Sequence, residues 1–221
     1  GGNGNDRIIW NTGDGSDVME GGEGDDTAEA NGSDTAGDVF EIRAGANGRV
    51  DFERTNFGPF SLDIGSTETL VVNGQGGDDV ITGGEGLAGL IDLKLYGGDG
   101  NDHITGGDGD DLLKGDEGDD VLVGFRGNDR MVGGAGNDRM IWNNGDGSDL
   151  MEGGADYDTA EVNGSDSFGD VFRIGAESNR RVELARVNFG NFALDIGSTE
   201  VLEVNGGTVE RLGLVEPARL L

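Results

Sequence analysis

Residues 97–141 read GGDGNDHIT, GGDGDDLLK, GDEGDDVLV, GFRGNDRMV and GGAGNDRMI, five consecutive nine-residue blocks. Each block is rich in glycine at its first, second and fourth positions, carries Asp at the sixth and an apolar residue at the eighth. After a two-residue insert, Trp142 and Asn143, the period resumes through residue 161 as NGDGSDLME and GGADYDTAE. The sixth-position aspartates of this array are Asp102, Asp111, Asp120, Asp129, Asp138, Asp149 and Asp158.

A shorter array with the same phase occupies residues 1–29 and places Asp6, Asp17 and Asp26 at the sixth position. Residues 74–82 return to the pattern with Asp79, whereas residues 83–91 have Ala88 where Asp is expected. Residues 1–74 also align without gaps on residues 133–206, and roughly two-thirds of the positions are identical. The chain is therefore internally duplicated.

The nine-residue block predicts a six-residue turn followed by a three-residue strand whose middle side chain points inward. Two blocks complete one coil, so alternate blocks stack on the same side at about 4.8 Å, the spacing of neighbouring strands. The predicted inward column is apolar and consists of Ile104, Leu113, Leu122, Met131, Met140 and Met151, with Ala28 and Ala160 as small members. This pattern predicts an all-β parallel solenoid.

Stacked turns would bring two carboxylates and several backbone carbonyls together, an oxygen-only shell that suits Ca²⁺ better than Mg²⁺ or a transition metal. The chain has one His and no Cys, which argues against zinc. About six Ca²⁺ ions are expected, because six stacked pairs follow from the repeat. These pairs are Asp102 with Asp120, Asp111 with Asp129, Asp120 with Asp138, Asp129 with Asp149, Asp138 with Asp158, and Asp6 with Asp26. Asp17 and Asp79 complete the set of expected ligands.

The composition is strongly acidic, with 45 Asp and Glu against 15 Lys and Arg and a formal net charge of −30. This charge repels nucleic acid and anionic lipid, and it opposes compaction unless cations neutralise part of it. We therefore expect no nucleic-acid partner, and we expect metal binding and folding to be one event. The apolar runs are far too short for a membrane span.

Outside the repeats, residues 30–73 predict short strands at 39–43, 49–54, 60–64 and 69–72, and residues 162–206 repeat this set. These segments are expected to form wider coils or a small sheet on the side of the solenoid, with the only conventional core made by Phe40, Phe52, Phe57 and Phe60. Residues 92–96 are interpreted as a spacer. The predicted division of the chain is 1–29, 30–73, 74–161, 162–206, and 207–221 as a tail or cap.

Other chemistry finds little support in the sequence. His103 is expected to face outward, and neither Ser16 nor Ser148 has a base within reach in the sequence. Paired carboxylates could suggest a glycosidase, but here they lie in the expected metal turns. No EF-hand loop, HExxH motif or P-loop occurs. We expect no enzymatic activity.

The blocks resemble the RTX (haemolysin-type) calcium-binding repeat over about half the chain. The longer unit, with WNxGDGSD, NGSD and LDIGSTE, looks like a module of large secreted bacterial RTX proteins. The resemblance implies a right-handed parallel β-roll, calcium-triggered folding outside the cell and type I secretion. It also implies that the repeats accompany a toxin, protease, lipase, adhesin or surface-layer protein, as they do in this family.

Two functions from different classes remain open. The first is a calcium-binding structural module of an extracellular bacterial protein. The second is an adhesive or surface-assembly segment, a calcium-stiffened rod that binds a cell-surface glycan or copies of itself. As a third possibility, the chain is the non-catalytic part of a secreted toxin or hydrolase.

Overall fold

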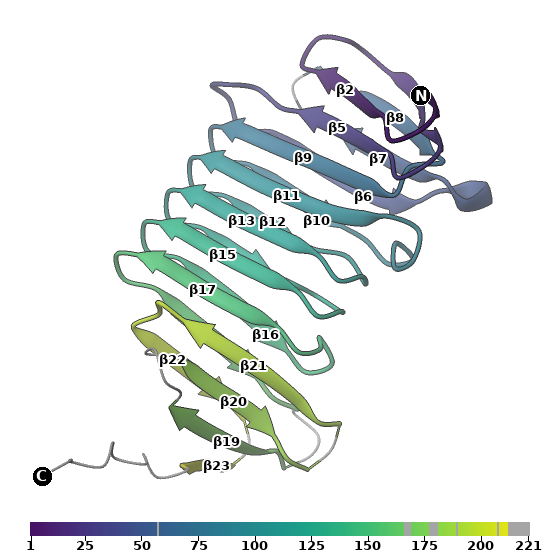
Figure 1. Cartoon of the computed structure of the whole chain (residues 1–221). Coiled ribbons are helices and arrows are strands. Elements are labelled where there is room, and N and C mark those ends of the chain that lie inside the picture. Colours follow the sequence, from purple (N-terminus) through teal and green to yellow (C-terminus); the bar gives the residue numbers. More distant parts are fainter. Residues whose placement is uncertain (57, 166–168, 177–180, 189, 207, 212–221) are drawn as a thin grey trace, which may run out of the picture.

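A computed structural model describes residues 1–56, 58–165, 169–176, 181–188, 190–206 and 208–211. The chain winds between two facing sheets, so that outside two three-stranded segments the strands of the roll alternate from one sheet to the other (Figure 1). This is the predicted all-β roll. Within the described residues, the only helix is the single 3₁₀ turn η1 (Ala46–Gly48), and none is long and apolar enough to cross a membrane.

The eleven-stranded sheet has the order β2 (Arg7–Asn11), β5 (Thr27–Asn31), β9 (Thr69–Gly76), β11 (Asp92–Asp99), β13 (Leu112–Glu117), β15 (Arg130–Ala135), β17 (Leu150–Ala155), β21 (Phe192–Gly197), β20 (Val182–Arg186), β19 (Val171–Ala176) and β23 (Thr208–Arg211). The ten-stranded sheet has the order β22 (Val201–Asn205), β18 (Thr159–Asn163), β16 (Arg139–Asn143), β14 (Val121–Val123), β12 (His103–Thr105), β10 (Val80–Gly83), β6 (Val39–Ala44), β7 (Val50–Arg54), β8 (Phe60–Gly65) and β3 (Asp17–Glu20). A small pair, β1 (Gly2–Asn3) and β4 (Gly22–Glu23), joins two turns near the N-terminus.

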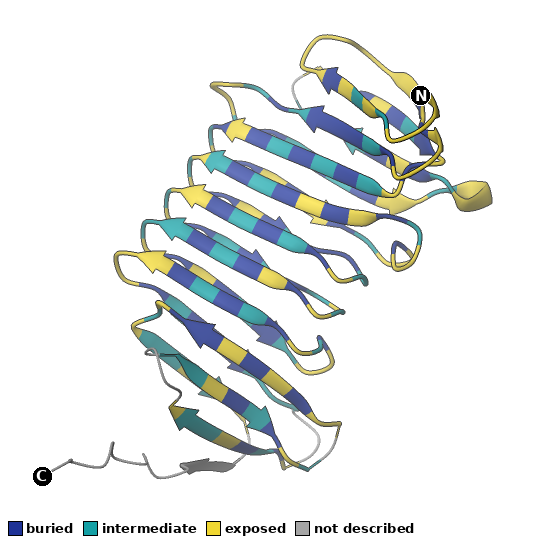
Figure 2. Ribbon diagram, viewed as in Figure 1, coloured by how far each residue is buried: buried dark blue, intermediate teal, exposed yellow. Residues whose placement is uncertain are grey.

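The repeat blocks stack in the predicted register. Leu113 of β13 lies beside Met131 of β15, and Ile104 of β12 lies beside Leu122 of β14, each pair 18 residues apart in the sequence. All eight residues expected to point inward are fully buried. Along most strands, buried positions alternate with more exposed ones, as Figure 2 shows for the eleven-stranded sheet. One apolar column therefore runs between the sheets.

The strands predicted outside the repeats form, and they continue the solenoid as wider coils of 42 residues, without making a separate sheet on its side. β6, β7 and β8 make an antiparallel meander inside the ten-stranded sheet, with β6 parallel to β10 and β8 parallel to β3. β19, β20 and β21 make the matching meander inside the eleven-stranded sheet. Each meander has three strands, an odd number, so its last strand runs in the same direction as its first, and both are parallel to the neighbouring strands of the roll.

The two copies of the duplicated unit, here called module one (residues 1–74) and module two (residues 133–206), use the two sheets in opposite ways. β2, β5 and β9 of module one pair within the eleven-stranded sheet, whereas their equivalents β16, β18 and β22 pair within the ten-stranded sheet. The modules are therefore related by a shift along the roll and an exchange of faces.

The aromatic residues do not form an isolated core, and that expectation was wrong. Phe40 contacts Phe52, whose ring lies 5.8 Å from that of Phe60, and Trp10 stacks on Phe60 with ring centroids 3.6 Å apart. These rings belong to one buried cluster that continues through the methionine and leucine column to module two. Phe57 lies outside the described residues.

Two further expectations need correction or comment. Residues 92–96 are not a spacer, because they form most of β11, which pairs with β9 and β13 along its length. The predicted cap at 207–221 falls largely outside the described part of the chain. Of that tail, the backbone of β23 pairs with β19 at the edge of the eleven-stranded sheet.

Candidate metal centres

The turns of the roll form two columns, one along each long edge (Figure 1). In the first turn column, the chain passes from the eleven-stranded to the ten-stranded sheet, as residues 97–102 do between β11 and β12. In the second turn column, the chain returns, as residues 106–111 do between β12 and β13. Each six-residue turn places its last residue, the repeat Asp, directly before a strand, except that Asp17 is itself the first residue of β3.

The structure brings together all six aspartate pairs that the repeat predicts. In each pair, the backbone N–H of one Asp donates to a carboxylate oxygen of the Asp one coil further on. The Asp102 N–H, for example, lies 2.8 Å from Asp120 Oδ1. The other five bonds measure 2.7–3.0 Å and join Asp6 to Asp26, Asp111 to Asp129, Asp120 to Asp138, Asp129 to Asp149 and Asp138 to Asp158. A seventh pair, Asp79 with Asp102, has the same geometry at 2.7 Å.

In eight of these aspartates, the second carboxylate oxygen has no hydrogen-bond donor. It is buried and unpartnered in Asp26, Asp79, Asp102, Asp120, Asp129, Asp138, Asp149 and Asp158. A buried charged oxygen without a partner is costly, and native structures rarely retain one unless water or an ion satisfies it. The repetition of this feature along both columns indicates one kind of missing partner.

Backbone carbonyls converge on the same places. A Cβ added to Gly97, the first residue of its turn, would collide with Asp102 Oδ2 and would lie 2.8 Å from the Gly115 carbonyl oxygen of the next coil. The first glycines at 74, 115 and 133 show the same combination of a repeat Asp oxygen and a carbonyl from the next coil. The glycine thus keeps open a small space lined by oxygens from two coils.

The raised pKa values of the repeat aspartates also indicate that these turns favour a bound cation. Burial raises the pKa of Asp129 to about 8 and that of Asp120 to about 7, with further increases from the neighbouring repeat aspartates. Burial also raises the pKa of Asp79 and Asp149 to about 7, and of Asp102, Asp111 and Asp138 to about 6. Without a cation, the columns hold negative charge poorly.

The donor set fits Ca²⁺. Within the described residues, no group of three or more His, Cys, Asp or Glu side chains surrounds a single point, so any site there must use backbone carbonyls as well. Carboxylate and carbonyl oxygens from two flexible turns match the six to eight oxygen ligands that Ca²⁺ takes. The repeat aspartates and the glycine carbonyls would hold the ion.

Not every predicted ligand is equally well placed. Asp17 lies on β3 at the edge of its sheet, is exposed, and pairs with no acidic residue of the described chain. Asp6 is only half-buried. Asp111 is buried, but its Oδ2 accepts the Gly107 N–H at 2.6 Å and is therefore not unpartnered. Whether these three residues bind metal stays a prediction.

The second turn column is interrupted at the block that lacks its Asp. Buried Leu87 fills that turn, and the Asp108 carboxylate accepts the N–H groups of Leu87 and Ala88 at 2.8 Å and of Gly86 at 2.9 Å. These donors lower the pKa of Asp108. Here backbone N–H groups satisfy the carboxylate, and no cation is required.

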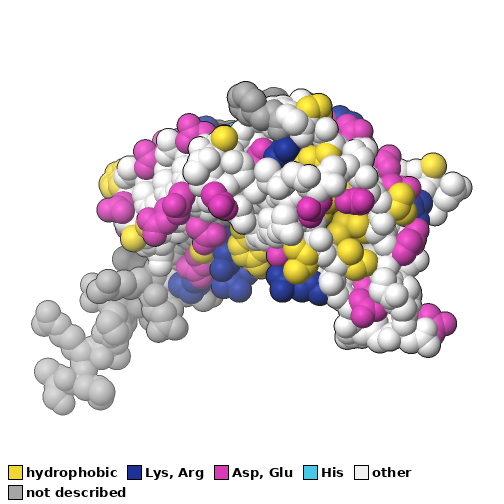
Figure 3. Space-filling view, turned by 90° about the horizontal axis from the view of Figure 1, so that it is seen from above, with side chains coloured by type: hydrophobic (Ala, Val, Ile, Leu, Met, Phe, Trp, Pro, Cys, Tyr) yellow, Lys and Arg dark blue, Asp and Glu magenta, His cyan; other side chains and the backbone are white. Residues whose placement is uncertain are grey.

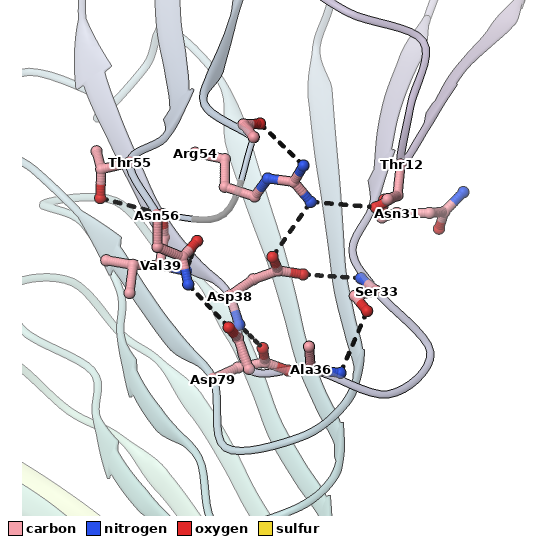
Figure 4. A network of polar contacts seen from close by, with 12 residues as sticks. Thr12, Asn31, Ser33, Ala36, Asp38, Val39, Arg54, Thr55, Asn56 and Asp79 are labelled. Atoms are coloured by element: carbon pink, nitrogen blue, oxygen red, sulfur yellow. Dashed lines mark hydrogen bonds and ion pairs between the residues drawn. The ribbon is translucent and has the colours of Figure 1, made fainter.

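Sequence reasoning missed a pair of buried arginines. Arg54 lies 3.2 Å from Asp38 Oδ1 (Figure 4). It also donates to the Gly58 carbonyl, and its guanidinium carbon lies 5.1 Å from the Phe60 ring centroid. Asp38 also accepts the Ser33 N–H, and its own N–H donates to Asp79 Oδ1. The Arg54 guanidinium therefore supplies the positive charge at this end of the first turn column.

Module two repeats this arrangement with Arg186 and Asp170, 3.3 Å apart. The signal available in the sequence was the duplication itself, because an Asp and an Arg keep the same spacing in both copies.

Residues set aside as non-catalytic have structural roles. The hydroxyl of Ser16 accepts the Ser61 N–H, and that of Ser148 accepts the Ala193 N–H, which ties a repeat turn to the meander in each module. His103 is exposed on the outer face of β12, as expected.

Comparison with known proteins supports the repeat assignment. The model of the RTX calcium-binding nonapeptide repeat matches residues 11–35, 71–86, 94–122 and 105–140. No curated protein sequence matches the chain. The extracellular lipase LipA of Serratia marcescens is 16% identical over 89% of this chain, with a TM-score of 0.29, and the chain spans only 37% of that structure. This similarity is too distant to carry an argument about function.

The nine-residue period, the stacked glycine turns with buried aspartates, and the match to the repeat model agree with one another. The chain contains RTX calcium-binding nonapeptide repeats.

Proposed function

We propose that this chain is a calcium-binding structural module of a secreted bacterial protein, that it folds when it meets Ca²⁺ outside the cell, and that it has no catalysis of its own. The observation that carries the proposal is the series of eight buried carboxylate oxygens without donors, six of them beside a carbonyl from the next coil. Seven aspartate pairs would accept about seven divalent ions, which offset a large part of the −30 charge.

The test is a calcium titration followed by far-ultraviolet circular dichroism. We expect chelator to abolish the β-type spectrum and millimolar Ca²⁺ to restore it, because ion binding and folding are coupled. Mg²⁺ at the same concentration is the control and should restore little, since it demands a tighter octahedral shell. A spectrum that chelator leaves unchanged would falsify the proposal.

A second candidate function, adhesion to an acidic glycan, has one specific observation in its favour. The outer face of the eleven-stranded sheet carries two adjacent rows of mostly cationic and apolar side chains, one of which ends in the acidic Glu152. They are Lys94, Leu112, Arg130 and Leu150, and Tyr96, Lys114, Val132 and Glu152. Among the described residues, Lys94, Lys114 and Arg130 belong to no ion pair, although the chain is strongly acidic.

Figure 3 shows Lys and Arg beside hydrophobic side chains in a hollow along one side, with acidic side chains over much of the remaining visible surface. Flat rows of this composition suit a sugar ring with a carboxylate or sulfate. In affinity electrophoresis, we expect heparin or alginate in the gel to slow the migration of the calcium-loaded chain. The K94E/K114E variant should lose this binding and migrate as it does without the glycan. Equal retardation of the wild-type chain and K94E/K114E by the glycan excludes this function for the two rows.

A further inference from the structure

Two short turns outside the repeats occupy positions where the roll otherwise has a calcium turn. Residues 65–68 connect β8 to β9, and residues 197–200 connect β21 to β22, both with the sequence GSTE. Neither turn contains the GGxGxD pattern. They nevertheless stack directly on the repeat turns that end in Asp26 and Asp158.

The serine carbonyls of these turns lie where a glycine carbonyl lies in a regular pair. A Cβ on Gly21 would collide with the Ser66 carbonyl oxygen, and one on Gly153 with the Ser198 carbonyl oxygen. In regular coils, the Gly115 carbonyl holds this position beside Gly97. Ser66 and Ser198 have φ values of 50° and 48°, a left-handed conformation that non-glycine residues seldom adopt. The turn holds this strained conformation in both modules.

The glutamates replace the second aspartate of a regular pair. The Asp26 N–H donates to Glu68 Oε2 at 2.7 Å, and the Asp158 N–H donates to Glu200 Oε2 at 2.9 Å. In a regular pair, Asp Oδ1 accepts this bond. The longer glutamate side chain compensates for a turn that is shorter than the repeat turn.

An unpartnered oxygen faces each of these places. Asp26 and Asp158 are 1% and 0% exposed, and their Oδ2 atoms, which lie beside Gly21 and Gly153, have no hydrogen-bond partner. The turns closed by arginine provide the contrast. Both oxygens of Asp38 are bonded, to Arg54 and to the Ser33 N–H, so nothing there requires a cation.

We propose that each module carries one further Ca²⁺ site of mixed type. One site is formed by Asp26, the Ser66 carbonyl and Glu68, and the other by Asp158, the Ser198 carbonyl and Glu200. Each site fastens the last strand of a meander, through its outgoing turn, to the stacked repeat turns. The inference rests on the proposed function, because it assumes that the regular turns take Ca²⁺.

The test counts bound ions by native mass spectrometry and calorimetry in E68Q, E200Q and the double variant. Glutamine keeps an oxygen for the Asp26 or Asp158 N–H but removes the charge and one possible ligand. The control is E85Q/E183Q, which removes the same charge from two exposed glutamates that lie outside the GSTE turns and outside the repeat turns that stack on them. Circular dichroism in saturating Ca²⁺ verifies folding.

We expect one ion fewer in each single variant, two fewer in the double variant, and no change in the control. An unchanged ion count in E68Q/E200Q, with the other ions bound as in the wild type, overturns the mixed sites and leaves the proposed function standing. A wild-type chain that binds no Ca²⁺ overturns both.

Discussion

At the scale of single residues, the buried arginines show that the roll accepts two kinds of cation. Arg54 and Asp38 are 7% and 2% exposed as side chains, and the guanidinium also packs on Trp10 and Phe60. Arginine suits this place because its flat group bonds the carboxylate and a carbonyl while stacking on rings. The meander of each module therefore carries its own fixed charge and does not depend on dissolved metal at that point.

Replacing Arg54 by Met tests this role. The change leaves the Asp38 carboxylate buried without its partner, which should lower the free energy of unfolding by about 3–5 kcal/mol. Urea unfolding in saturating Ca²⁺ measures the loss, with Arg130→Met as the control at an exposed cation that has no ion pair. A loss below about 1 kcal/mol, the range of surface pairs, would contradict the assignment.

At the scale of the turn, glycine is required by backbone approach between coils. Gly118, the fourth residue of its block, has φ 131°, and a Cβ there would collide with the Gly100 carbonyl oxygen. Gly109 holds the same place in the preceding block, but its coil neighbour is the turn with Ala88. A Cβ on Gly109 would meet only ordinary contacts at 3.6 and 3.7 Å.

The two glycines thus form a matched pair. We expect Gly118→Ala to lower stability by at least about 1 kcal/mol, the order of a residue forced into left-handed backbone, whereas Gly109→Ala should change little. Thermal unfolding in saturating Ca²⁺ compares the two variants. Equal midpoints would show that the coils can move apart without loss.

At the scale of the whole molecule, the aspartate columns make the metal-free fold sensitive to pH. Burial raises the pKa of these carboxyls to between about 6 and 8 in the fold, against about 3.9 in an unfolded chain. The folded state therefore binds more protons than the unfolded state. Its stability is greatest below pH 4 and declines as the pH rises through 6 to 8.

In calcium-free buffer, we accordingly expect β-type circular dichroism to appear as the chain is acidified from pH 8 to pH 4. Saturating Ca²⁺ should remove most of this dependence, because the ion replaces the protons. A metal-free spectrum that stays unchanged on acidification would show that the carboxyls do not control folding.

The repeat predicted most of the roll because its period is strict. The pairing of Asp129 with Asp149 was predicted correctly in spite of the two-residue insert between them, since the block phase resumes after the insert at Trp142. Residues 92–96 were misjudged because a strand in this roll can be longer than the repeat allows. Arg54 and Glu68 were missed because they act across 16 and 42 residues respectively, and no local pattern marks such contacts.

The exchange of faces between the two modules has a consequence for presentation. The outer surface of β2 and β5 carries the Arg7–Glu29 ion pair, and the matching Arg139–Glu161 pair of β16 and β18 lies on the opposite side of the rod. A receptor that recognises this shared surface would meet it twice, facing in opposite directions. One rod could then bridge two such receptors, but it could not use both copies to strengthen its hold on a single flat surface.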